Sequence, residues 1–400
     1  MKTIALAFRY LWSRPLAALL NLLLLTLGLA SITFVVLTST QVSGAFERDL
    51  AGIDLVVGAK GSPMQLILAG VFQIDVPPGN IALADVQALQ QNPQVARLIP
   101  LSMGDAFRGH RVVGTTADYL AHYRLALAQG QAWQLPMEAV LGAQAAVATG
   151  LKTGDGFIGN HGLSGAGHAH GDTPYRVSGV LAPCGCVADR LVLTSLESVW
   201  QVHEKATALD EADRQALEAE REVTVALITY NSPLAAVTFP RMVNTTTEMQ
   251  AAAPAVEVTR LLRMLGVGTE VLQGLGAVLL LTAALGVFIA LWSAVRERRA
   301  DLAMLRMLGA PPTRVAALLL CEALWLAVLA SVLGLAAGHG LTALAGSLLA
   351  AQQSLPVTGW LWVAQEAWIP VAALAVAVVA ALIPVLSAWR VDVAQLLHAR

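Results

Sequence analysis

Histidines and cysteines gather in one glycine-rich stretch of this 400-residue chain, after residue 160. Neutral imidazole nitrogens and thiolate sulfurs are preferred ligands of Zn²⁺, and short His-rich tracts are a metal-binding composition. The candidate ligands are His161, His168, His170, Asp172, Cys184 and Cys186. Glycines and a serine between the histidines make the stretch flexible enough to fold around an ion. The stretch is a candidate site for the transient capture of Zn²⁺ or Cu²⁺, although the spacing matches no closed structural zinc motif; the alternative is a solvated loop whose histidines bind nothing in particular.

The sequence leaves three states possible for the two neighbouring cysteines. Thiols tend to pair in an oxidising compartment, but residues two apart on one strand make a strained bridge. Cys184 and Cys186 could therefore be a free pair, a metal-ligand pair or a labile disulfide. We expect the third cysteine, Cys321, to pack as a small hydrophobic residue.

The sequence carries no motif for an enzyme or for a resident cofactor. Residues 58–62, GAKGS, have the wrong order for a GxxxxGK[ST] phosphate loop, and HExxH and GxSxG do not occur. The net charge of −2 predicts no strong attraction to nucleic acid. We therefore expect no catalysis on this chain and no nucleic-acid partner.

Long uncharged segments indicate a membrane protein. The chain is 56% hydrophobic and 13% charged, against about 25% charged in soluble proteins. Four uncharged segments are long enough to cross a hydrocarbon core of about 30 Å, and we expect transmembrane helices over residues 16–39, 271–295, 322–350 and 367–389. The alternatives are buried core helices of a soluble protein and, for the first segment, a cleaved signal peptide.

The charges around these segments predict the topology. Lys and Arg collect in the N-terminal tail, in the connection between the second and third segments and in the C-terminal tail, whereas residues 351–365 have none. By the positive-inside rule both termini and the Arg-rich connection are cytoplasmic. Residues 40–270 then lie outside, with 15 basic and 22 acidic residues against 10 and 5 in the rest of the chain. We expect three parts, 1–39, 40–270 and 271–400, the middle one continuing as a stalk into the second span.

The external part reads as an α+β domain inserted after the first of the four helices, a 1+3 arrangement. Short β-type runs alternate with helical stretches. The expected strands are 53–57, 111–114, 175–181, 190–193 and 223–230, and the expected helices are 83–91, 137–149 and 196–222.

One ionisable residue lies inside an expected span away from its ends. His339 stands between Gly338 and Gly340, and intramembrane ionisable residues often mark ion or proton pathways. We favour a small-residue packing contact over a proton relay, with Gly334 and Gly338 bringing the third span close to a neighbour.

The connection between the second and third spans predicts a short amphipathic helix. Leu302, Leu305 and Leu308 recur at helical spacing, and Gly309 with the following prolines ends the helix. The interpretation that needs no specific function is a helix held at the membrane surface by contacts between Arg and lipid.

This segment, residues 296–312, together with the pattern leading to Glu322-Ala323, resembles the permeases of the FtsX/MacB/LolC type. Residues 7–15 resemble their amphipathic N-terminal helix and residues 384–397 resemble their ending. The resemblance implies a multi-pass permease of the bacterial inner membrane whose periplasmic part is a MacB-like core domain. It also implies a cytoplasmic ABC ATPase as partner, with ATP bound there, and a homodimer or paired permease.

In such permeases the connection docks on the ATPase, and the stalk passes the motion to the periplasmic domain, which works on a periplasmic or outer-membrane partner. The coupling residues implied by position are Arg298, Arg299, Asp301, Leu302, Leu305, Arg306, Leu308, Gly309 and Glu322. Zinc uptake or export of a periplasmic substrate would be the transport process. The alternative from another class is a membrane scaffold that regulates a cell-envelope enzyme without translocation.

Overall fold

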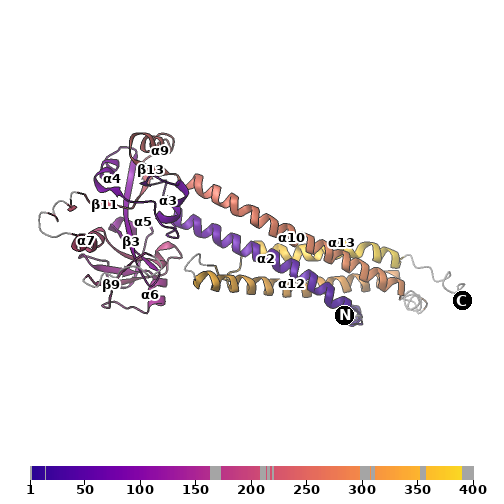
Figure 1. Ribbon diagram of the computed structural model, residues 1–400. Helices are drawn as coiled ribbons and strands as arrows, with labels where there is room; N and C mark the ends of the chain where they lie inside the picture. Colours follow the sequence, from indigo (N-terminus) through magenta and orange to yellow (C-terminus); the bar gives the residue numbers. More distant parts are fainter. Residues whose placement is uncertain are drawn as a thin grey trace. The chain divides into compact units, whose positions relative to one another are not determined.

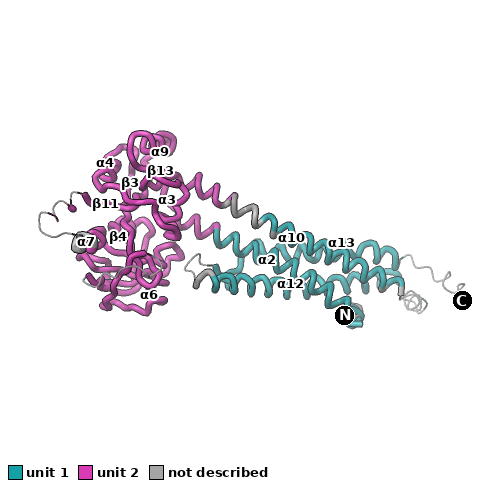
Figure 2. The backbone as a smooth tube through the Cα atoms, viewed as in Figure 1, with its two compact units in different colours: residues 1–42, 264–350, 356–400 teal, residues 43–263, 351–355 magenta. Residues whose placement is uncertain are grey.

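The computed structural model describes residues 2–13, 15–162, 173–207, 213, 217–218, 220–297, 307, 311–351 and 357–389. Two compact units make up the chain (Figure 2). The helical unit comprises residues 1–42, 264–350 and 356–400, and the α/β unit comprises residues 43–263 and 351–355. The expected domains 1–39, 40–270 and 271–400 stay predictions, because these units are defined by compactness alone.

The helical unit is built from long apolar helices. Its elements are α1 (Lys2–Leu11), α2 (Pro15–Leu50), α10 (Pro254–Glu297), α12 (Pro312–Ala351), η2 (Ala364–Ala367) and α13 (Trp368–Trp389), of which α2 and α10 continue into the α/β unit. Among the described residues, four stretches are long and apolar enough to cross a membrane: Pro15–Leu50, Gln273–Ser293, Pro312–Leu348 and Ala364–Trp389. These are the four candidate spanning helices expected from the sequence, and their order along the chain is consistent with one before the inserted domain and three after it (Figure 1).

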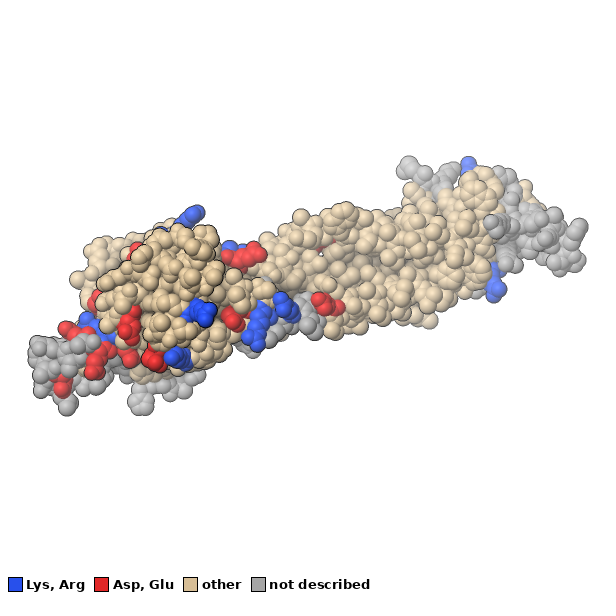
Figure 3. Space-filling model, turned by 90° about the horizontal axis from the view of Figure 1, so that it is seen from above, with Lys and Arg blue, Asp and Glu red and all other residues tan. Residues whose placement is uncertain are grey.

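Small side chains form much of the core of the helical unit. Leu25 and Leu29 of α2 are buried against alanines such as Ala327, Ala330 and Ala373 of the later helices. Leucines and valines that point outward remain exposed, as Leu16 and Leu281 do, which suits a lipid environment. On the face seen in Figure 3 the surface of this unit is almost entirely uncharged along its length.

A mixed sheet is the centre of the α/β unit, with strand order β13-β1-β12-β3-β4-β10-β6-β9-β5. Strand β7 pairs with β9, β8 pairs with β3, and β11 and β2 form a separate two-stranded sheet. The strands are β1 (Leu55–Ala59), β2 (Ile81–Ala82), β3 (Val95–Phe107), β4 (His110–Thr115), β5 (Leu127–Gly130), β6 (Glu138–Leu141), β7 (Gly156–Phe157), β8 (Asn160–His161), β9 (Tyr175–Leu181), β10 (Val192–Ser195), β11 (Glu222–Val223), β12 (Val225–Tyr230) and β13 (Met249–Ala252).

Helices cover this sheet over two hydrophobic clusters. The helices are α3 (Pro63–Gly70), α4 (Leu83–Gln90), α5 (Ala117–His122), α6 (Ala143–Thr149), η1 (Val187–Arg190), α7 (Leu196–Thr207) and α9 (Ala235–Thr246). One cluster joins β1 and β12 to α4 and α9 through residues such as Leu55 and Phe239. The other lies around β4, β6, β9 and β10, with Phe157 and Tyr175 at its centre. The long strand β3 pairs with β12 and with β4, so it belongs to both halves.

The structure agrees with most expected elements of the α/β unit and corrects one. Residues 175–181 are strand β9, and α4 begins at the expected residue. Residues 138–141, expected as the start of a helix, are instead strand β6, because they are buried between β10 and β9 and pair with both. The end of the expected helix 196–222 falls partly outside the described residues; α7 ends at Thr207 and residues 222–223 are strand.

Candidate functional site

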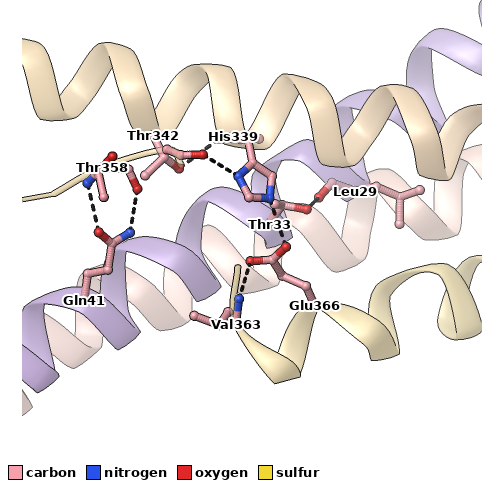
Figure 4. Close-up of polar contacts among 10 residues, drawn as sticks. Leu29, Thr33, Gln41, His339, Thr342, Thr358, Val363 and Glu366 are labelled. Atoms are coloured by element: carbon pink, nitrogen blue, oxygen red, sulfur yellow. Dashed lines mark hydrogen bonds and ion pairs between the residues drawn. The ribbon is translucent and has the colours of Figure 1, made fainter. Parts of the chain in front are cut away.

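The polar cluster around His339 is the candidate site of the helical unit (Figure 4). His339 lies on α12, and its Nε2 atom is 2.9 Å from Oε2 of Glu366, which belongs to η2. Its Nδ1 atom is 2.6 Å from the carbonyl oxygen of Gly359. The side chains of His339 and Glu366 are 12% and 3% exposed, so the pair is buried.

The hydrogen bonds of this pair restrict where its protons can lie. A carbonyl oxygen only accepts, so Nδ1 of His339 must carry a hydrogen and donate it to Gly359. Nε2 and Oε2 both accept hydrogen bonds when they carry no hydrogen, so the 2.9 Å contact between them requires a hydrogen on one of the two atoms. Pairing of this kind offsets part of the desolvation cost of burying two ionisable groups. Oε1 of Glu366 accepts a further bond from the Val363 backbone N–H at 3.2 Å.

Segment 357–363 places Glu366 beside His339 by packing closely along α12. A Cβ atom on Gly346 would collide with the carbonyl of Val357, and one on Gly359 would collide with the carbonyl of His339. The ring of Trp362 lies 4.3 Å from the imidazole of His339. Glycine at both positions thus lets the segment approach the helix and lead into η2.

Helix α2 closes the cluster on another side. Gln41 donates from Nε2 to the Thr358 carbonyl and accepts the Thr358 N–H at Oε1, both at 2.9 Å. A Cβ on Gly338 would collide with Thr33, and one on Gly334 would lie 2.6 Å from Cβ of Leu29. The expected close approach of the third span through Gly334 and Gly338 is therefore observed, and the neighbour is α2.

Sequence reasoning missed Glu366 and Gln41 as members of this cluster. It treated Glu366 as a charge that bounds two apolar segments, although the residue is 3% exposed. The one signal in the sequence was the isolation of Glu366, which is the only acidic residue between Glu322 and Asp392.

The expected metal ligands are distributed over described and undescribed parts of the α/β unit. His161 ends strand β8, and its Nδ1 lies 3.2 Å from Oδ1 of Asp105, which is almost fully buried on β3. His168, His170 and Asp172 lie outside the described residues. Within the described ranges, no group of three or more His, Cys, Asp or Glu residues could hold a metal ion. The zinc site stays a prediction.

The two neighbouring cysteines form a disulfide. Cys184 and Cys186 are bonded to each other, so of the three open states the structure adopts the bridge, and neither sulfur is available as a thiolate ligand in this form. Cys321 is a free cysteine, half-buried in α12.

The expected ATPase-coupling residues lie almost entirely outside the described part of the chain, since residues 298–306 and 308–310 are not described. Glu322, the last of them, lies on α12 with its side chain buried, 5% exposed. Their role in coupling stays a prediction.

The four long apolar helices and the α/β unit fit a membrane protein with an inserted domain, and comparison with known proteins identifies its family. The family model of the FtsX-like permease C-terminal matches residues 274–392, and that of the MacB-like periplasmic core domain matches residues 18–263, more than half of the chain. The chain belongs to the FtsX/MacB-like family of ABC transporter permeases. It is accordingly a multi-pass membrane protein with a periplasmic domain, the α/β unit.

Two solved structures of periplasmic or extracellular regions also match. The periplasmic region of MacB from Actinobacillus actinomycetemcomitans is 13% identical, with a TM-score of 0.35, over 53% of this chain and 95% of that one. The extracellular domain of the noncanonic ABC-type transporter YknZ from Gram-positive bacteria is 13% identical, with a TM-score of 0.31, over 50% and 98%. None of the curated proteins matches the chain.

Proposed function

We propose that this chain couples ATP hydrolysis on a separate cytoplasmic ATPase to a conformational change of its own periplasmic domain. ATP is bound by the partner, and this chain supplies the mechanical connection. Both termini and the connection between α10 and α12 face the cytoplasm of a bacterial inner membrane, as the distribution of Lys and Arg favours. The working unit is a homodimer or a pair of related permeases, and it acts on a periplasmic or outer-membrane partner.

The observation that carries this proposal is the length of two helices. Helix α2 has 36 residues and α10 has 44, whereas about 20 residues suffice to cross the hydrocarbon core. The α/β unit begins at Ser43, within α2, and its main part ends at Arg263, within α10. Both of these connections are therefore helical, and a helix transmits displacement that a flexible linker would absorb.

The polar cluster around His339 supports the proposal from within the membrane part. It ties α2 to α12 and to the start of α13 through Gln41, His339 and Glu366. Because α2 is one of the two helices that enter the periplasmic domain, a movement of α12 driven from the cytoplasmic side would also move α2. The coupling residues between 298 and 309 would receive that movement from the ATPase.

Zinc as the transported or sensed ion is a separate part of the proposal. Its support is the composition of the loop that starts at His161, together with the anchoring of His161 on β3 by Asp105. With the cysteines bonded to each other, the ligands would be the imidazoles and Asp172, which bind Zn²⁺ without thiolates.

Co-purification from membranes of the native host tests the coupling. The tagged chain is extracted in a mild detergent, and the retained proteins and the ATPase rate are measured. We expect an ABC ATPase to be retained and to be lost with Leu305→Asp, while Leu127→Asp, an exposed position of β5, retains it. Absence of any ATPase would contradict coupling and would favour a scaffold that regulates a cell-envelope enzyme. If Leu305→Asp retains the ATPase as well as the unmodified chain does, the assignment of the coupling helix is wrong. Coupling itself would not be contradicted by that result.

A further inference from the structure

The Cys184–Cys186 disulfide lies in a loop of the α/β unit that buried side chains hold in place. Asp189 accepts the backbone N–H of Cys184 at 3.0 Å and that of Gly185 at 2.8 Å. Arg48, near the end of α2, donates from Nε to the Gly185 carbonyl at 2.9 Å, and Asp49 accepts the Val187 N–H at 2.8 Å. The loop is thus positioned independently of the disulfide.

This disulfide adds little to the stability of the fold. The bridge encloses a single residue, Gly185, and the loop-closure entropy that a disulfide removes from the unfolded chain shrinks with the length of the closed loop. Both cysteines are only half-buried, and accessible disulfides are the ones that exchange with thiols. A reactive role accounts for the bridge better than a structural one.

Both cysteines line a pocket of about 680 Å³ whose charged residues are all basic. Arg48, Arg97, Arg124 and His122 contribute to its wall, and no Asp or Glu does. Across the described ranges no carboxylate lies within 4.0 Å of these three guanidinium groups. Asp49 and Asp189 are buried in the protein behind the disulfide loop and bind its amides. The pocket therefore favours an anionic ligand.

His122 is a second observation that points to an acidic ligand. Its buried Nε2 atom has no hydrogen-bond partner among the described residues. Burial, assisted by the charge of Arg97, lowers the pKa of His122 from its ordinary value. An acidic group in the pocket would favour the protonated imidazole of His122 and accept a hydrogen bond from its Nε2 atom. It would also offset the repulsion between His122 and Arg97.

We propose that the Cys184–Cys186 pair is a thiol–disulfide exchange site for a small thiol that carries carboxylates. The thiolate of the bound molecule attacks Sγ of Cys186, the S–S bond breaks, and Cys184 leaves as a thiolate. The Cys186 N–H, 3.2 Å from Sγ of Cys184, stabilises that leaving group. A second thiolate attacks the mixed disulfide, so that two thiols are oxidised to one disulfide and the protein bridge gains two electrons and two protons.

The experiment compares glutathione with its diethyl ester, which has the same thiol but no carboxylate charge. The full-length chain carrying Cys321→Ser is purified in detergent, and the appearance of free thiols is followed by maleimide gel shift. With rates expressed per thiolate, we expect glutathione to react about tenfold faster than the ester. We expect this advantage to fall as salt rises and to vanish in Arg97→Gln/Arg124→Asn; Asn is chosen because residue 124 has a φ of 50°.

Matched variants decide the outcome. Arg241→Gln, an exposed arginine of α9 outside the pocket, should keep the full advantage. Cys186→Ser should abolish glutathione capture, because the remaining Cys184 has no bridge to open. Equal rates for the two thiols, a rate independent of the pocket arginines, or a bridge that stays closed in folded protein would each overturn the proposal.

Discussion

His339 of α12 and Glu366 of η2 form a buried pair in the membrane part of the chain, with 2.9 Å between Nε2 and Oε2. The two residues are 27 positions apart and stand on opposite sides of the connection between the last two spans. Because the pair joins η2 to α12, and Gln41 joins α2 to the same connection, it bears on stability and on the proposed coupling.

Removing one member of this pair should be worse than removing both. His339→Leu or Glu366→Leu alone leaves an ionisable partner buried, and breaking such a pair costs about 3–5 kcal/mol. The double variant buries no charge and should unfold at a temperature well above that of either single variant. Thermal unfolding in detergent measures the three midpoints. Additive effects of the two single substitutions would contradict the pairing.

The contact between α12 and α2 should tolerate no side chain at Gly338. Gly338→Val would collide with Thr33 and should lower the free energy of unfolding by about 1–3 kcal/mol. Gly340→Val is the matched control, because nothing lies within 4 Å of its Cβ position. Unfolding of both variants in detergent separates the effect of packing from that of helix propensity. Equal destabilisation would remove the close approach as the explanation.

The periplasmic domain should lose stability in mild acid through His110. Burial, reinforced by the charge of Arg190, lowers the pKa of His110 from its ordinary value of 6.5, despite the hydrogen bond from Nδ1 to the Arg190 carbonyl. Below pH 6.5 the unfolded chain therefore binds a proton that the folded chain does not. The free energy of unfolding should fall as the pH falls, by at most about 1.4 kcal/mol per pH unit from this residue.

The check is thermal unfolding between pH 7.5 and 5.5 with His110→Gln as the comparison. The variant should be less stable at pH 7.5, because its side chain fits the site less well, but its midpoint should change less with pH. An identical pH slope in both proteins would show that His110 does not contribute.

The His-rich loop should bind zinc through its imidazoles. Calorimetry on the full-length chain in detergent should show micromolar Zn²⁺ binding that His168→Ala/His170→Ala weakens at least tenfold. His110→Gln, whose ring already bonds to a carbonyl, should leave binding unchanged. Millimolar or absent binding by the unmodified chain would remove zinc from the account.

Much of the architecture could be predicted because it rests on patterns of charge and hydrophobicity that are visible along the sequence. Soluble proteins rarely contain uncharged segments of twenty or more residues, so these segments predict the four candidate spanning helices directly. Strand β9 alternates buried and exposed residues along Tyr175–Leu181, and that period is visible in sequence. Residues 138–141 were assigned wrongly because Ala, Val and Leu are compatible with either element, and only pairing with β10 and β9 decides.

The candidate sites were harder to predict because they depend on contacts between distant residues. Nothing in the local sequence of Glu366 indicates that a connection folds back along α12 to meet His339. Likewise, Arg48, Arg97 and Arg124 come from three separate segments, and only the fold assembles them beside Cys184 and Cys186. The choice between a free pair and a disulfide also depends on how the backbone turns at Gly185.

The most direct test of coupling is the distance between a label on the periplasmic domain and one on the membrane part. Val147 and Trp360 are 85% and 88% exposed, so Val147→Cys and Trp360→Cys can carry spin labels in a Cys321→Ser background. Pulsed electron paramagnetic resonance on the complex with its ATPase then compares ATP with ADP. A nucleotide-dependent shift in the distance distribution is the predicted result, and identical distributions in both states would contradict the proposed transmission.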